Sequence, residues 1–250
     1  MFLRSIKNLF FKFRYRFKGI PFQIANYTLY FDESLRRWNM EVELAVHRIL
    51  GRHLNPGHVF IDIGANFGLH TLYAAKLVGD KGFVFAFEPV PANLKLLRRN
   101  VALSGVQQQV KIVPKAVSNS SEPFVTFYLP PEEVAVTASL CSNPVTYKTI
   151  QLSNVRLDDY WSNLDLPVQF IKIDVEGAEL EVLRGAENLL KQWHPTLLIE
   201  VHGFALPNFG SNVNELRNFL KNIGYQESVL DSDGLCEENY FHALYRTKNY

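Results

Sequence analysis

Three acidic residues, Asp62, Glu88 and Asp174, each follow a short run of mostly apolar residues. Such runs are typical of buried strands in a parallel sheet. Open α/β sheets bind their ligands beyond the carboxyl ends of the strands. We therefore expect the three carboxylates to lie at one ligand-binding edge of a sheet.

Two glycines lie between the first two of these acids and predict a tight turn that leads into a helix. Gly64 can adopt backbone angles that are closed to other residues, and Gly68 lets a helix approach a strand closely. Glu88 follows Gly68 by about 20 residues, the separation at which dinucleotide folds place the acid that binds a ribose. Residues 59–88 therefore predict a strand, turn, helix and strand that bind a nucleoside cofactor through Glu88.

The glycine spacing separates two classes of cofactor. A dinucleotide site has the pattern G-x-G-x-x-G, in which helix amides face a pyrophosphate. This sequence instead has Asp62-x-Gly64-x-x-x-Gly68, which lacks the middle glycine and places a carboxylate where it would repel a diphosphate. The acid suits a cofactor with a cationic amino-acid end and no phosphate, such as S-adenosylmethionine. An NAD-dependent oxidoreductase and an ordinary α/β turn with a helix cap are the alternatives.

The length and composition are those of one globular domain with a short appendage. The chain has 250 residues, of which 47% are hydrophobic and 20% charged. We expect an N-terminal basic helix and cap over residues 1–54 and a cofactor-binding domain over residues 55–250. Cys141 and Cys236 are far apart and have no second ligand at metal spacing, so they indicate neither a disulfide framework nor a metal site.

Positive charge is concentrated in the first residues of the chain. Six of the 26 basic residues lie in residues 1–18, which contain no acid, so the rest has 20 basic and 25 acidic residues. This acidic remainder argues against nucleic acid as a partner, because enzymes that flip bases need a basic track for phosphates. Apolar residues recur at helical spacing from Phe2 to Phe17 and predict a basic amphipathic helix.

Two roles are open for that helix. It can pack on its own domain or a second subunit, or it can give a cytoplasmic protein peripheral contact with a membrane. No apolar run is long enough to predict a transmembrane helix. Oligomeric state is not indicated by the sequence.

The remaining pattern alternates strands and helices and ends on two strands with no helix between them, which must pair antiparallel. Five βα units followed by such a hairpin are the plan of the class I methyltransferase sheet, a Rossmann-like and mostly parallel α/β sheet with an antiparallel last strand. The elements expected are a hairpin (22–31), helices (41–50 closed by Gly51, 91–103, 157–161, 175–186, 213–223), further strands (110–113, 123–129, 145–152, 170–174, 196–202, 225–230, 241–246) and a lid loop (130–144).

Four features carry a resemblance to a known family: FIDIGANFG (60–68), AFEP (86–89), the pair Asn93 and Asn100, and IKIDVEGAE (171–179), the most specific. With them the chain resembles the FkbM-type S-adenosylmethionine-dependent methyltransferases. The resemblance extends over about residues 55–202. It implies S-adenosylmethionine as cofactor and methyl transfer to oxygen on sugars, polyketides, glycolipids or other small metabolites.

The resemblance also implies which residues hold the cofactor. Glu88 would bind the ribose, and Asp174 would lie beside the sulfonium. The methionine part would be surrounded by Asp62, Gly64, Asn66 and Gly68, the adenine would be bordered by Ala116, Val117 and Ser118, and Ala65, Thr71, Pro89 and Asn93 would complete the site.

Methyl transfer is a displacement at carbon, so much of its catalysis is positioning. An acceptor hydroxyl must also lose its proton, which a carboxylate or an imidazole can take. Asp174, Glu176 and His202 are the candidates, and the ordinary pKa of histidine, near 6.5, suits a base at neutral pH. Glu176 and Glu179 have an alternative role at the positive end of a helix. No compact motif supports a divalent cation on Asp174, Glu176 and His202, so we expect no metal.

The leading hypothesis is an O-methyltransferase that acts on a small molecule or a glycan. The non-enzymatic alternative is a catalytically silent module that keeps the cofactor site. Such a module would bind the cofactor but would not turn over any acceptor. We assign the choice of acceptor to the N-terminal cap and to the loop over residues 130–144.

Overall fold

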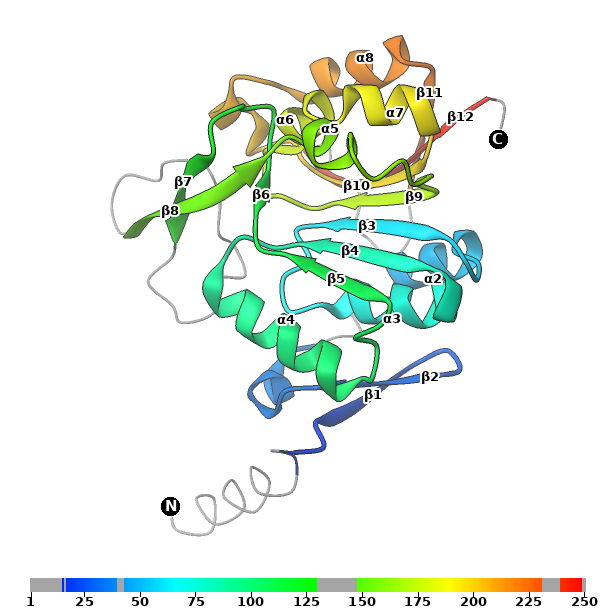
Figure 1. The fold of residues 1–250 in the computed structure, drawn as a ribbon. Coiled ribbons are helices and arrows are strands. Elements are labelled where there is room, and N and C mark those ends of the chain that lie inside the picture. The colour runs from blue at the N-terminus through cyan, green and yellow to red at the C-terminus, as the bar shows by residue number, and fades with distance from the viewer. Residues whose placement is uncertain (1–14, 16, 40–42, 130–147, 231–238, 249–250) are drawn as a thin grey trace.

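The computed structural model describes residues 15, 17–39, 43–129, 148–230 and 239–248. Its centre is a seven-stranded sheet, seen nearly edge-on in Figure 1. The strands are β3 (Val59–Ile63), β4 (Phe83–Phe87), β5 (Val110–Val113), β9 (Phe170–Ile173), β10 (Thr196–His202), β11 (Tyr225–Val229) and β12 (Tyr240–Thr247), in the order β11-β12-β10-β9-β3-β4-β5.

The direction of the strands confirms the predicted class of sheet. Neighbours among β10, β9, β3, β4 and β5 pair in parallel. The last strand, β12, pairs antiparallel with both β10 and β11. The fold is therefore the mostly parallel α/β sheet with an antiparallel last strand that the sequence predicts.

Helices cover both faces of the sheet because its central strands are apolar on both sides (Figure 1). Along β3, Ile61 and Ile63 join the apolar cluster on one face, and Phe60 joins the cluster on the other. The first face is covered by α5 (Leu157–Trp161), α6 (Glu179–Arg184), α7 (Glu187–Trp193) and α8 (Val213–Asn222). The second is covered by α2 (Leu44–His53), α3 (Leu69–Val78) and α4 (Pro91–Leu103).

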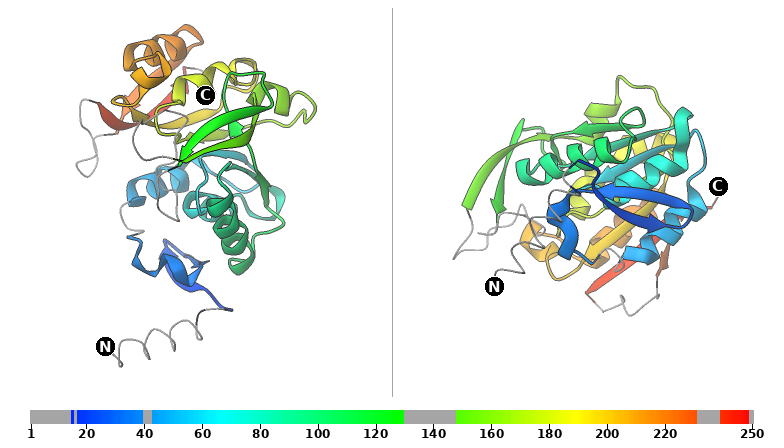
Figure 2. Two further views of the ribbon diagram at one scale, coloured as in Figure 1. Left: turned by 90° about the vertical axis from the view of Figure 1, so that its left-hand side faces the viewer. Right: turned by 90° about the horizontal axis from the view of Figure 1, so that it is seen from below.

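An N-terminal hairpin lies outside α3 and α4, as the views of Figure 2 show. It consists of β1 (Ile20–Ile24) and β2 (Tyr27–Phe31), followed by a 3-10 turn, η1 (Glu33–Arg37), which confirms the predicted hairpin. The buried side-chain amide of Asn100 on α4 fixes the end of the hairpin. The Asn100 oxygen accepts from the Asp32 backbone amide at 2.8 Å, and the Asn100 nitrogen donates to the Phe67 carbonyl at 2.8 Å. The hairpin shares an apolar cluster with the sheet, so the boundary near residue 54 stays a prediction.

The two strands predicted after the third strand of the main sheet form a separate small sheet. β7 (Phe124–Leu129) pairs antiparallel with β8 (Lys148–Val155), and β8 pairs in parallel with the short β6 (Ala116–Val117). The predicted lid over residues 130–144 lies outside the described residues, as does nearly all of the predicted helix over residues 2–17.

Two predicted helices differ from those observed. The helix predicted to close at Gly51 continues to His53, and Gly51 lies where a Cβ would meet the Tyr73 hydroxyl at 2.9 Å. The helix predicted over residues 175–186 is a loop followed by α6 and then by a separate α7. Glycine is needed at position 185, because it packs against the Ser118 carbonyl, where a Cβ would lie 2.2 Å away.

Within the described residues, no helix combines the length and the apolar character needed to cross a membrane.

Gly64 gives a stability prediction with a matched control. Gly64 has a φ of 82°, and a Cβ there would lie 1.8 Å from the Asp174 carbonyl oxygen. Gly57 has a similar φ of 90° with nothing within 4 Å. Gly64→Ala should lower the free energy of unfolding by at least about 3 kcal/mol, because the clash adds to the backbone strain. Gly57→Ala should cost only about 1 kcal/mol. Equal losses in urea denaturation would mean that the β3 and β9 ends are not held this closely.

Candidate active site

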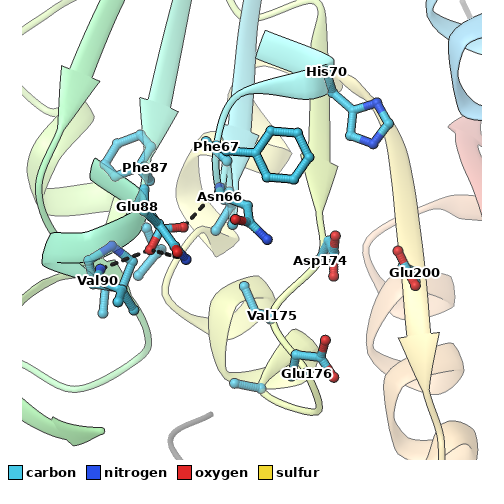
Figure 3. Close-up of a pocket in the computed structure, with 18 of the residues that line it drawn as sticks. Asn66, Phe67, His70, Phe87, Glu88, Val90, Asp174, Val175, Glu176 and Glu200 are labelled. Carbon is cyan, nitrogen blue, oxygen red and sulfur yellow. Dashed lines mark hydrogen bonds between the residues drawn. The ribbon is translucent and has the colours of Figure 1, made fainter. Parts of the chain in front are cut away.

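A cavity of about 260 Å³ opens at the carboxyl ends of β3, β4 and β9 (Figure 3). Nine of the residues predicted to bind cofactor line it, along with the candidate base Glu176. These nine are Gly64, Ala65, Asn66, Glu88, Pro89, Asn93, Ala116, Val117 and Asp174. The wall also contains residues that the sequence did not indicate, among them Trp38, Glu43, Phe67, His70 and Phe127.

Four other predicted residues, Asp62, Gly68, Thr71 and Ser118, lie behind the wall rather than in it. The carboxylate of Asp62 is fully buried and accepts the Thr71 hydroxyl at 2.5 Å. Ser118 donates to the side chain of Asn154 at 3.0 Å. Their geometry is that of residues that support the cavity, and direct contact with a cofactor stays a prediction for them.

The glycine turn has the backbone that its sequence predicts. Gly64, Asn66 and Gly68 have φ values of 82°, 50° and 95°. The amides of Gly64 and Ala65 both donate to the Phe87 carbonyl at 3.0 Å, which ties the end of β3 to the end of β4. The close neighbour of Gly68 is Leu97 of α4, whose Cδ1 would lie 2.6 Å from an added Cβ.

Glu88 lies at the end of β4 with its carboxylate almost entirely buried. One oxygen accepts the Asn66 amide at 2.9 Å, and the other accepts the Val90 amide at 2.8 Å (Figure 3). Burial raises the pKa of Glu88 to about 7, although these two hydrogen bonds act in the opposite direction. The carboxylate is thus held in one orientation at the cavity wall.

Lys172 places a fully buried ammonium group beneath this site. It lies opposite Asp62 in the pairing of β9 with β3, and its Nζ donates to Asp174 at 2.9 Å. Burial alone would lower the pKa of Lys172, but attraction to Asp174, Asp62 and Glu200 raises it above its ordinary value. Lys172 therefore stays charged, pairs with Asp174 and attracts the carboxylates of Asp62 and Glu200.

His202 lies at the end of β10, behind the cavity wall. Its Nδ1 lies 2.7 Å from the fully buried carboxylate of Glu179, and its Nε2 lies 3.6 Å from both Glu176 and Glu200. Burial alone would lower the pKa of His202, but the hydrogen bond to Glu179 and the other carboxylates raise it to about 9. The ring is therefore an imidazolium at neutral pH, unlike the neutral base that its ordinary pKa predicts.

Glu176 lies in the loop between β9 and α6, with an unusual φ of 55°. The alternative role for Glu176 was to stabilise the positive end of a helix from its first turn. Glu176 does not lie in that turn, because α6 begins at Glu179. Burial raises the pKa of Glu176 to about 7, while the positive charge of His202 acts to lower it. Glu176 is thus a carboxylate in the cavity wall that can exchange a proton near neutral pH.

A second, more open pocket of about 430 Å³ adjoins the cavity. The two share Glu176 and Glu200 in their walls, and the second pocket is otherwise lined by His202, Phe204, Asn239 and Tyr240. The Phe204 side chain is 62% exposed, and the Tyr240 hydroxyl donates to Glu200. An acceptor entering here would meet an aromatic surface and would reach Glu176.

Asp174, Glu200 and His202 are the described residues whose ligand atoms gather closely enough for a metal ion, within 4.8 Å of one another. The sequence grouped Glu176 with Asp174 and His202 instead. The Lys172 ammonium already neutralises Asp174, and the imidazolium of His202 faces Glu200. Two positive charges beside these donors therefore disfavour a divalent cation, and the absence of a metal stays a prediction.

Comparison with known proteins identifies the relatives of the chain. The methyltransferase FkbM domain matches residues 62–227. The hexuronic acid methyltransferase AglP of Haloferax volcanii is 27% identical over 173 residues, covering 68% of this chain and 67% of its own length. The 31-O-demethyl-FK506 methyltransferase FkbM of Streptomyces tacrolimicus is 31% identical over 166 residues, covering 55% of this chain and 63% of its own length.

Two solved structures show the same fold at low identity. An FkbM methyltransferase from Methylobacillus flagellatus has a TM-score of 0.51 and 17% identity, covering 81% of this chain and 51% of its own. Fibrillarin from Aeropyrum pernix, with bound S-adenosyl-L-methionine, has a TM-score of 0.51 and 14% identity. The match covers 82% of this chain and 74% of the fibrillarin chain. These likenesses confirm the class I methyltransferase architecture.

The burial of Lys172 predicts a larger effect on stability than that of an exposed lysine. Lys172→Met should lower the free energy of unfolding by about 3–5 kcal/mol at neutral pH, because it leaves the buried Asp62 and the partly buried Asp174 without a cation. Adding Asp62→Asn should recover part of this loss, which a double-mutant cycle in urea denaturation measures. The exposed Lys81 is the control, and Lys81→Met should change stability by less than about 0.5 kcal/mol. Additive losses for Lys172 and Asp62 would show that the two do not interact.

Proposed function

The chain belongs to the FkbM methyltransferase family and is an S-adenosylmethionine-dependent methyltransferase, and we propose that it methylates a hydroxyl oxygen of a sugar, glycolipid or other small metabolite. The observation that carries the proposal is Glu176, a carboxylate with a pKa of about 7 at the junction of the cavity and the open pocket. The printed names of two relatives, a hexuronic acid methyltransferase and a 31-O-demethyl-FK506 methyltransferase, support a small hydroxylated acceptor.

The cavity fits the cofactor in charge and in donor set. Asp174, Glu176 and Glu200 bring carboxylates to one end of it, where a sulfonium and an ammonium group would be favourable. The buried side-chain oxygen of Asn66 has no hydrogen-bond partner among the described residues and can accept from that ammonium group. Family membership and this charge leave no support for a nicotinamide cofactor.

We assign the remaining contacts from the positions of the residues. Glu88 binds the ribose hydroxyls, since it is the carboxylate at the end of β4, and the backbone of Gly64, Ala65 and Asn66 borders the methionine part. Ala116 and Val117 border the adenine. When bound, S-adenosylmethionine supplies a methyl group made electrophilic by its cationic sulfur.

The chain supplies the base that the acceptor needs. A hydroxyl in the open pocket donates its proton to Glu176, whose pKa near 7 suits both the uptake and the release of a proton. His202 does not act as the base at neutral pH, because it is already protonated. It holds Glu176 and Glu200 by its positive charge, and Glu179 fixes its ring. Asp174 accepts a hydrogen bond from Lys172 and faces the sulfonium.

The affinity for cofactor should depend on the ionisation of Glu88. Because the carboxylate accepts the ribose hydroxyls, binding of S-adenosylhomocysteine should be constant above pH 7 and should weaken as pH falls through about 7. Glu88→Gln should lower the affinity by about tenfold or more at pH 8 and remove this dependence. Isothermal titration calorimetry over a pH series measures both. The assignment fails if Glu88→Gln binds as tightly as the wild type.

Methyl transfer from labelled S-adenosylmethionine to a panel of glycosides and hydroxylated metabolites tests the function itself. The product should carry an O-methyl group, and kcat should rise with pH through about 7 as Glu176 ionises. Glu176→Gln should lower kcat by about 10²-fold or more while binding of S-adenosylhomocysteine persists. His202→Gln should move the pH profile upward, because the positive charge that lowers the pKa of Glu176 is lost.

Two outcomes would count against this account. Full activity of Glu176→Gln would remove it as the base. Cofactor binding with no transfer to any hydroxyl of the panel would favour the catalytically silent binding module.

A further inference from the structure

A basic groove lies on the side of α4 that faces the N-terminal hairpin, apart from the cofactor cavity. It has a volume of about 880 Å³ and is open to solvent along its length. Phe17, Lys18 and Tyr30 form its wall on the hairpin side, and Lys95, Arg98 and Arg99 form its wall on α4. Figure 1 shows how the hairpin and this helix lie side by side.

The charge of the basic groove is strongly positive. Four of its lining residues are cationic, and none of them is acidic. Lys18, Lys95 and Arg98 are exposed and form no ion pair with another described residue. Arg99 pairs with Asp32 and Glu33. Positive charge that is not neutralised within the fold can attract an anionic partner.

An exposed aromatic side chain stands beside these cations. Phe17 is 78% exposed, the highest value among the large apolar residues of the described chain. A site built only for phosphate groups has no use for such a residue, whereas the headgroup boundary of a membrane accepts an aromatic ring among Lys and Arg side chains. The sequence continues the same combination upstream, where residues 1–16 contain five basic residues and four phenylalanines.

From these observations we propose that the basic groove is a docking surface for an anionic lipid membrane. Lys18, Lys95 and Arg98 attract the lipid phosphates, and Phe17 enters the headgroup boundary. The cofactor cavity, whose wall includes Asp174 and Glu176, shares no lining residue with the basic groove.

The proposed orientation fixes how far the cofactor cavity lies from the lipid. Asn93 in the first turn of α4 lines the cavity, and Arg98 and Arg99 lie further along the same helix. The 13 residues of α4 span about 20 Å. Docking through the basic groove therefore holds the cavity within about one helix length of the headgroups.

Co-sedimentation of the full chain with vesicles tests the proposal. The wild type should bind vesicles that contain phosphatidylglycerol and phosphatidylcholine, and should bind phosphatidylcholine vesicles at least tenfold more weakly. Combining Lys18→Glu, Lys95→Glu and Arg98→Glu should lower binding to the anionic vesicles by at least tenfold, since each cation near the surface contributes to the attraction. Phe17→Ser should weaken the binding that persists at high salt.

A matched variant controls for net charge. Lys81→Glu, Lys221→Glu and Arg246→Glu together change the charge equally at exposed positions outside the basic groove, and should keep vesicle binding within about twofold of the wild type. Melting temperature and binding of S-adenosylhomocysteine should be unchanged in both triple variants. Equal loss of vesicle binding in the two, or no vesicle binding by the wild type, would overturn the proposal. Binding to RNA homopolymer but not to vesicles would assign the basic groove to nucleic acid instead.

Discussion

The buried ammonium group of Lys172 is the interaction on which the active site depends. Asp62, Asp174 and Glu200 lie at the ends of three different strands, and repulsion between them would separate those strands if no cation stood among them. Lys172 is fully buried, donates to Asp174 and is paired in register with Asp62. The cation that stabilises the sheet at this edge therefore also permits an acidic cavity to exist there.

One buried cation cannot neutralise all the carboxylates that surround it. Burial raises the pKa values of Glu176 and Glu88 to about 7. The pKa of Glu200 is instead lowered to about 2, because its interactions with His242, Lys172 and Tyr240 outweigh its burial. Glutamates with the same side chain thus have different pKa values because their surroundings differ. The protonated His202 completes this arrangement, since it favours the ionised form of Glu176 without taking the proton itself.

Much of the fold follows from local patterns. Apolar runs of four or five residues, the glycines at 64 and 68, and the helix from Pro91 to Leu103 are visible in the sequence and confirmed in the structure. The loop that carries Glu176 was missed, because the apolar spacing of residues 175–186 is compatible with a continuous helix. Close packing of Gly177 against Ala205 and of Gly185 against Ser118 decides otherwise, and neither contact is local.

The site was predicted in part for a similar reason. Acids at strand ends indicate the cavity edge, but the pKa of His202 depends on Glu179, which lies 2.7 Å away and 23 residues earlier. Trp38 and Phe127 line the cavity from the hairpin side and the inserted sheet, and no local motif indicates them. Lys172 was read as part of a buried strand, since its role appears only once β3 and β10 lie beside it.

The central claim is that burial leaves Glu176 and Glu88 able to exchange protons near neutral pH. It is tested most directly by an NMR titration of the protein with ¹³C-labelled glutamate carboxyl groups, with Glu176→Gln and Glu88→Gln used for assignment. The account predicts that both signals titrate with midpoints near pH 7. Midpoints near the ordinary glutamate value of about 4.3 would contradict it.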